Sequence, residues 1–97
     1  MPISYRAAQT LIRRGDEEGL TKALDEGLDP NLTNENGWSL LMLAAVEGAV
    51  PLGKILLGKG ASNEPKNSKN ETALDIACNR GFGLFVELLA DPSTPPA

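Results

Sequence analysis

Residues 37–48 of this chain read GWSLLMLAAVEG, a turn glycine followed by a short apolar stretch that ends at a second glycine. That second glycine belongs to a series, because Gly15, Gly48 and Gly81 are spaced by 33 residues. Other small and apolar positions recur at the same spacing: Ala8 with Leu41 and Leu74, Leu11 with Ala44 and Ala77, Ile12 with Ala45 and Cys78, Ala23 with Leu56 and Leu89, and Gly27 with Gly60. Agreement at so many positions predicts three copies of one structural unit.

Each copy is predicted to form two short helices. The first helices are expected over residues 4–14, 39–47 and 72–80, and each is followed by one of the spaced glycines, as is common just beyond a helix C-terminus. The second helices are expected over residues 17–26, 51–57 and 83–90. Asp16 can cap the first of these, and Pro51 fits an opening turn. Between the copies, residues 29–37 and 62–70 are rich in Asn, Pro and Gly, which predicts turns.

This pattern resembles the ankyrin repeat. The resemblance rests on residues 37–48, on ILL at 55–57 with GA at 60–61, on TALDIA at 72–77 and on GLDPN at 27–31. It covers about residues 4–90 and implies an all-α fold, an ankyrin-repeat solenoid of three helix-turn-helix repeats with turn or hairpin loops between them. We expect an ankyrin repeat domain over residues 1–90, with repeats at about 1–33, 34–66 and 67–90, and a Pro-rich disordered tail over residues 91–97.

The chain departs from the ankyrin pattern at two kinds of position. The Thr-Pro-Leu-His stretch of the family is RAAQ at residues 6–9, SLLM at 39–42 and TALD at 72–75, and the chain contains no histidine. The hydrogen bonds that this histidine usually makes must therefore be missing or replaced. The turn glycine is Gly37 in the middle repeat but Asn70 in the last, and asparagine tolerates the left-handed conformation less well than glycine.

Composition narrows the classes of function. The net charge of −4 argues against a nucleic-acid binder, which needs a basic face to neutralise phosphates. Residues 38–46 form the longest apolar run, too short to span a bilayer, and the first residues do not resemble a signal peptide, so we expect a cytoplasmic protein with no membrane partner. Cys78 is the single cysteine and aligns with small helix-packing positions, which predicts a buried thiol.

Catalytic and metal-binding chemistry is not predicted. Without histidine, the chain lacks the commonest general base and the commonest zinc ligand. Cys78 has no basic partner that could activate it as a nucleophile. The acidic run at residues 16–18 is explained by the favourable position of carboxylates at a helix N-terminus. We therefore expect no enzyme activity, no cofactor and no metal.

The resemblance also implies where a protein partner would bind, because ankyrin stacks usually grip partners with the turn tips and the exposed side of the first helices. The matching positions are Tyr5, Arg13, Arg14, Thr33, Glu35, Asn36, Trp38, Val46, Glu47, Lys66, Lys69, Glu71, Asn79 and Arg80, with Ser68 beside them. Trp38 is the favoured anchor, since tryptophan, tyrosine and arginine dominate binding hot spots. The alternative for Trp38 is packing over its own turn, and the alternative for Tyr5 is covering the open end of the stack.

The last predicted helix leaves little polar surface, although a terminal repeat normally presents a polar outer face. Its apolar residues would be covered by the tail, by a partner, by a second copy or by further chain. Self-association through Phe82, Leu84 and Phe85 is one of these alternatives.

Three functional hypotheses follow. The first is an inhibitor or immunity-type protein that masks one partner, such as a toxin, an enzyme or a regulatory protein, by analogy with small bacterial ankyrin proteins. The second is an adaptor or scaffold segment with several weaker partners. The third, an enzyme, is disfavoured by the lack of histidine and of a paired nucleophile.

Overall fold

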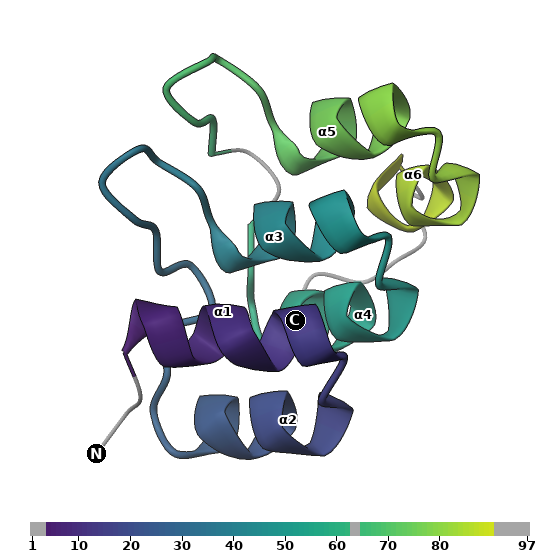
Figure 1. Cartoon of the computed structure of the whole chain (residues 1–97). Helices are drawn as coiled ribbons and strands as arrows, with labels where there is room; N and C mark the ends of the chain where they lie inside the picture. The colour runs from purple at the N-terminus through teal and green to yellow at the C-terminus, as the bar shows by residue number, and fades with distance from the viewer. Residues whose placement is uncertain (1–3, 63–64, 91–97) are drawn as a thin grey trace.

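Six helices make up the described part of the chain, which in this computed structural model is residues 4–62 and 65–90 (Figure 1). They form three pairs in chain order: α1 (Tyr5–Arg14) with α2 (Glu17–Asp25), α3 (Leu40–Glu47) with α4 (Val50–Gly58), and α5 (Ala73–Arg80) with α6 (Gly83–Ala90). Each predicted helix is present with ends within one residue of the prediction. Within these residues the secondary structure is helical apart from one isolated antiparallel bridge between Thr33 and Ser39. The all-α repeat architecture is thus confirmed.

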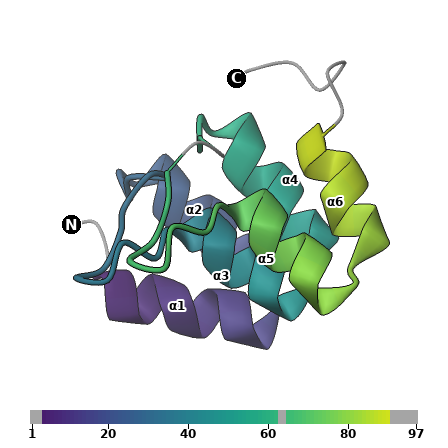
Figure 2. The ribbon, with the colours of Figure 1, turned by 90° about the horizontal axis from the view of Figure 1, so that it is seen from above.

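The helices stack in two layers. The first helix of each pair contacts the first helix of the next, so α3 lies between α1 and α5, and the second helices follow in the same order, with α4 between α2 and α6 (Figures 1 and 2). The loops that precede α3 and α5 project as hairpins on one side of the stack (Figure 2). No helix in the described residues is long and apolar enough to cross a membrane. The predicted tail at 91–97 lies outside the described residues.

The inner helices α1, α3 and α5, the first helices of the three pairs, end at the predicted glycines and begin at side-chain caps. The side chains of Ser4, Ser39 and Thr72 accept hydrogen bonds from the backbone three residues on, at 3.2–3.3 Å. Each helix ends at a glycine in the left-handed conformation, with φ between 65° and 75°. The starts lie one residue after the predicted ones because Ser4, Ser39 and Thr72 are caps rather than helical residues.

The missing histidine is replaced by two different residues. Met42 Sδ accepts a hydrogen bond from the Ser39 backbone N–H at 3.4 Å, and Asp75 Oδ2 accepts one from the Thr72 N–H at 3.1 Å. Both bonds complete a reciprocal capping box, so the first turn of α3 and of α5 keeps its polar backbone groups paired.

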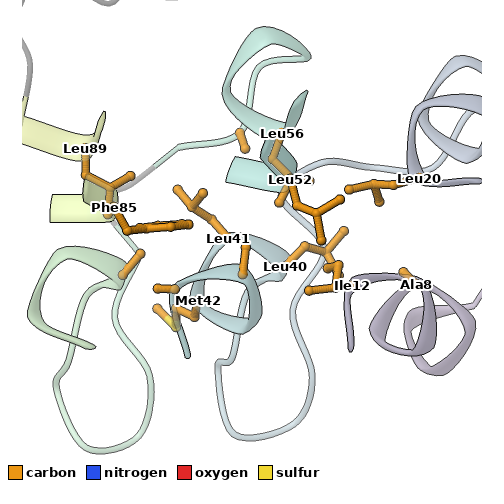
Figure 3. Close-up of a cluster of buried hydrophobic side chains, with 14 of the residues drawn as sticks. Ala8, Ile12, Leu20, Leu40, Leu41, Met42, Leu52, Leu56, Phe85 and Leu89 are labelled. Carbon is orange, nitrogen blue, oxygen red and sulfur yellow. The ribbon is translucent and has the colours of Figure 1, made fainter. Parts of the chain in front are cut away.

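One continuous core fills the space between the two layers (Figure 3). Its largest fully buried side chains are Phe85, Ile12, Leu20, Leu40, Leu41, Met42, Leu52 and Leu56. Fully buried alanines on the inner helices, Ala8, Ala44, Ala45 and Ala77, leave no bulk between neighbouring backbones. Phe85 is aromatic, and the other core side chains named here belong to Ile, Leu, Met and Ala, which allows the short helices to pack closely.

The structure corrects two expectations about burial. Phe85 is fully buried, so it cannot form part of a self-association surface with Phe82 and Leu84. A Cβ atom placed on Gly53 of α4 would lie 2.9 Å from the Phe85 ring, which shows that this glycine makes room for the ring. Cys78 is exposed rather than buried. Its equivalent in the middle repeat, Ala45, is buried because α3 has an inner helix on both sides, whereas α5 has one on a single side among the described residues.

Candidate protein-binding surface

Trp38 stands at the base of the first hairpin, and the hairpin is held rigidly by Asn34. The Asn34 Oδ1 atom accepts hydrogen bonds from the backbone N–H groups of Asn36 and Trp38, both at 2.9 Å. The Asn34 N–H in turn donates to the Trp38 carbonyl at 3.1 Å. An asparagine that closes its own turn in this way fixes the backbone of the residues that follow it. The position of Trp38 is therefore set by local sequence.

The second hairpin repeats this arrangement one unit later. Asn67 Oδ1 accepts from the N–H groups of Lys69 and Glu71, and the Asn67 N–H donates to the Glu71 carbonyl at 3.0 Å. Asn70, where the family has glycine, adopts the left-handed conformation with φ of 63°, as predicted. The Ser68 N–H donates to the Asn36 carbonyl at 2.8 Å, which joins the two hairpins side by side.

Tyr5 and Trp38 are linked directly. The Tyr5 hydroxyl donates a 2.8 Å hydrogen bond to the Trp38 carbonyl oxygen, and both side chains are half-buried against the core. Burial raises the pKa of the Tyr5 hydroxyl to about 12, because desolvation disfavours the phenolate. Tyr5 thus ties the start of α1 to the hairpin that carries Trp38.

A groove crosses the inner helices beside Trp38. Its volume is about 270 Å³, and the residues that line it are Gln9 and Arg13 of α1, Trp38, Leu43, Val46 and Glu47 of the middle repeat, and Arg80 of α5. The apolar side chains of Trp38, Leu43 and Val46 are half-buried, while the charged ones are exposed. An apolar centre with a charged rim is the usual anatomy of a protein-binding surface.

Five of the predicted binding residues meet in this groove, and these are Arg13, Trp38, Val46, Glu47 and Arg80. The other predicted residues lie on the helices and hairpins outside the groove. Arg14 and Asn79 are exposed near the ends of α1 and α5 but do not line the groove. Thr33, Glu35, Asn36, Lys66, Ser68 and Lys69 are exposed on the hairpins, and half-buried Glu71 accepts a 3.1 Å hydrogen bond from the Asn67 side chain.

The sequence prediction did not include Gln9 and Leu43. Gln9 occupies the position of the family histidine, where a structural role was expected. Leu43 follows three buried residues and resembles core in a purely apolar run, yet it is half-buried at the groove. The repeat register gives no clear signal for this position, because Leu43 aligns with exposed Thr10 of α1 and also with buried Ile76 of α5.

Other kinds of site find less support in the described part of the chain. Residues 4–62 and 65–90 contain no cluster of three acidic or cysteine side chains placed to hold a metal ion. The exposed carboxylates of Glu17, Glu18 and Asp25 of α2 and of Glu26 directly after it border a shallow hollow together with Lys22 and Ile55. Asp25 forms an ion pair with Lys59, which joins this region to the end of α4. The hollow beside α2 is therefore mostly acidic, whereas the groove beside Trp38 contains two arginines and one glutamate.

Comparison with known families agrees with this architecture. A family model described as ankyrin repeats in three copies matches residues 5–95. The chain belongs to the ankyrin repeat family, whose members serve as protein–protein interaction modules.

Individual relatives are similar over part of their length only. The chain is 43% identical over 60 residues to the NAD-capped RNA hydrolase NUDT12 of Homo sapiens, a match that covers 62% of this chain and 13% of that protein. It is 36% identical over 78 residues to the ankyrin repeat and KH domain-containing protein mask of Drosophila melanogaster, covering 78% of this chain and 2% of that protein. It is 31% identical over 76 residues to ankyrin repeat family A protein 2 of Mus musculus, covering 78% of this chain and 24% of that protein.

These partial matches do not extend to the other domains of the relatives. The chain spans less than a quarter of the length of each of these three relatives, so the hydrolase activity in the first name does not transfer to this chain. The relatives come from animals, and others from plants, so they give no support to the expected likeness to small bacterial ankyrin proteins.

Proposed function

We propose that this domain is a non-enzymatic, cytoplasmic binding module that grips and masks a single protein partner through the groove beside Trp38. The observation that carries the proposal is the groove itself, in which Trp38, two further apolar residues and three charged residues share one hollow. The three charged residues come from α1, α3 and α5, the first helices of the three repeats. Large side chains that are held in place before binding lose little conformational entropy when a partner arrives.

A masking role is supported by the rigidity of the surface. The second hairpin is hydrogen-bonded to the first, and the first to α1, so the groove exists before any partner binds. A preorganised surface of this kind favours one tight partner over many adaptable contacts. The partner would be a toxin, an enzyme or a regulatory protein whose own working surface is covered in the complex.

A second candidate is an adaptor role, and one observation favours it. In the relatives, the matching segment is a small part of a much longer protein, between 2% and 24% of the length. A segment in that setting can recruit a partner to another domain without inhibiting it. The adaptor role predicts several weaker partners and a gain in apparent affinity when copies are linked.

The experiment is a pull-down from the lysate of the source cell, read by mass spectrometry. Trp38→Ala is the test variant and Leu84→Ala is the matched control, because Leu84 is 72% exposed on α6 and lies outside the groove. Circular dichroism confirms that both variants are folded. One stoichiometric partner that is lost with Trp38→Ala and kept with Leu84→Ala is the expected result.

The remaining outcomes decide against parts of the proposal. A partner that survives Trp38→Ala and is lost with Leu84→Ala would move the binding surface to α6. Several substoichiometric partners that depend on Trp38 would favour the adaptor role. If a single partner is found, adding the domain to that purified partner should abolish its activity; unchanged activity would rule out masking.

A further inference from the structure

The charges of the groove suggest a specific chemistry for its occupant. The chain as a whole carries a net charge of −4, yet the groove is lined by two arginines and one glutamate, a local balance of +1. Most of the acidic residues lie elsewhere, with three of them on α2 and Glu26 directly after it. A positive groove in a negative protein selects an occupant of complementary charge.

The two arginines approach the groove from opposite sides. Arg13 belongs to α1 and Arg80 to α5, and α3 lies between these helices with Val46 and Trp38 of its repeat at the groove. An apolar strip is therefore bordered by a guanidinium on each flank. Arginine presents a planar fork of donors that matches a carboxylate, so each flank is a ready site for one carboxylate.

Both guanidiniums are available for this role. The ion pair between Lys59 and Asp25 is the one salt bridge in residues 4–62 and 65–90, so within those residues neither Arg13 nor Arg80 has a carboxylate within 4.0 Å. Their exposed side chains lie in the last turns of their helices, where any cation is favourable. That preference would be met equally by Arg14, which does not line the groove. The favourable position of a cation at a helix C-terminus therefore explains why basic residues occur at these helix ends. It does not explain why two of them share one hollow with Trp38.

We infer that the groove binds an acidic peptide segment of the partner, in which an apolar side chain packs on Trp38 and Val46 and carboxylates on either side of it pair with Arg13 and Arg80. This inference rests on the proposed function and adds the chemical class of the partner. Glu47 is the one carboxylate of the groove and opposes such a ligand. Its presence also disfavours a polyphosphate, whose dense charge would need a uniformly basic surface.

The test begins with selection from a display library of short random peptides on the immobilised domain. The enriched peptides should carry Asp or Glu on both sides of an aliphatic or aromatic residue. The most enriched peptide is then synthesised with a fluorescent label, and its dissociation constant is measured by fluorescence anisotropy. Arg13→Gln and Arg80→Gln should each weaken binding about five- to tenfold, and the double variant by the product of the two effects. Arg14→Gln is the matched control and should change binding less than about twofold.

Two further measurements predict changes in peptide affinity that would not occur if the charged residues of the groove only stabilised the fold. Glu47→Gln keeps the size of the side chain and should tighten binding about twofold, because it removes the opposing charge. Raising the salt concentration from about 0.05 M to about 0.3 M should weaken binding to the native domain, and much less to the Arg13→Gln, Arg80→Gln double variant. Circular dichroism of each variant establishes that the effects do not come from unfolding.

The failure of the inference can be told apart from the failure of the proposed function. Enrichment of neutral or basic peptides that require Trp38 but ignore both arginines would overturn the inference and leave the groove as a binding surface. Peptides that bind equally well to Trp38→Ala would overturn both. Failure to enrich any acidic peptide would overturn the inference. Binding of a short single-stranded oligonucleotide with the same dependence on Arg13 and Arg80 would overturn it in favour of a phosphate ligand.

Discussion

The Tyr5 hydroxyl and the Trp38 carbonyl oxygen are joined by a 2.8 Å hydrogen bond between residues one repeat length, 33 residues, apart. The two aromatic residues occupy the same place in successive repeats, so the ring of one repeat supports the backbone that carries the ring of the next. The bond connects the first helix of the stack to the wall of the groove. It makes the N-terminal repeat part of the binding surface without placing Tyr5 in the groove itself.

Replacing Tyr5 with phenylalanine should destabilise the domain modestly and weaken partner binding. The Trp38 carbonyl keeps its bond from the Asn34 N–H, so the loss should be about 1 kcal/mol, the typical net contribution of one hydrogen bond. Urea denaturation followed by circular dichroism measures the free energy of unfolding. Thr10→Ala serves as a control because its hydroxyl bonds only to the Arg6 carbonyl of its own helix. Equal unfolding free energies for Tyr5→Phe and the native domain would show that the bond adds nothing.

Alkaline pH should remove the same interaction in the native domain. The Tyr5 pKa rises from the usual 10.0 to about 12 on folding, so the neutral hydroxyl is favoured in the folded state. The resulting stabilisation is fully present below pH 10 and is lost as the pH rises to about 12. We expect the loss to be on the order of 1 kcal/mol, since the ring keeps part of its solvent contact. The free energy of unfolding, measured in urea from neutral to alkaline pH, should fall more steeply for the native domain than for Tyr5→Phe. Parallel curves would contradict the assignment.

Gly37 sits where the two hairpins meet, and alanine at this position should destabilise the domain by about 1–3 kcal/mol. Its φ of 78° is unfavourable for alanine, and the added Cβ would lie 3.1 Å from both the Asn67 Cα and the Lys66 carbonyl oxygen. Gly58→Ala is the matched control, because a Cβ there meets open space within α4. That substitution should raise stability by about 0.4–1 kcal/mol. Thermal and urea unfolding of both variants test the pair, and a similar loss at both positions would show that the hairpin contact is not the cause.

Much of this fold could be predicted from the spacing of three glycines, because a repeat fixes the structure of each unit through its own caps and turns. The same 33-residue register also distinguishes the exposed side chain of Leu84 from the buried one of Phe85. Leu84 aligns with exposed Pro51, and Phe85 aligns with buried Leu52. The expectation that both face outward came from counting apolar residues in the last helix rather than from this alignment. Of the groove residues on helices, Arg13, Val46, Glu47 and Arg80 were predicted by carrying the family surface over residue by residue, whereas Gln9 and Leu43 were not.

The register fails at the end of the stack. Cys78 aligns with Ile12 and Ala45, which are both buried, yet Cys78 is exposed. Burial at this position is supplied by the next inner helix, and α5 has none beyond it among the described residues. Sequence within one repeat therefore predicts which side chains can be covered, but the number of neighbours decides which of them are.

Phe85 and Leu84, adjacent in α6, should respond to truncation very differently. Phe85→Ala empties a fully buried site against Gly53 and should cost about 3–5 kcal/mol, enough to unfold a marginal domain. Leu84→Ala changes an exposed side chain and should shift the unfolding free energy by less than about 0.5 kcal/mol. Phe85→Leu, which refills most of the space, provides a folded intermediate for the comparison. Similar losses for Phe85→Ala and Leu84→Ala in urea denaturation would contradict the packing of α6.

Cys78 offers a direct measurement of whether the end of the stack is open. As an exposed thiol on α5, it should react with Ellman's reagent in the native domain within a few-fold of the rate in urea. A buried thiol would instead react only in the unfolded or locally opened domain, and therefore orders of magnitude more slowly. The protein concentration distinguishes self-association from an open surface, because a second copy over α5 and α6 would slow the reaction only when the domain is concentrated. Leu84→Asp should restore the fast rate in that case, since a charge in an apolar contact between copies opposes association. A rate that stays fast at every concentration would rule out self-association through this end of the stack.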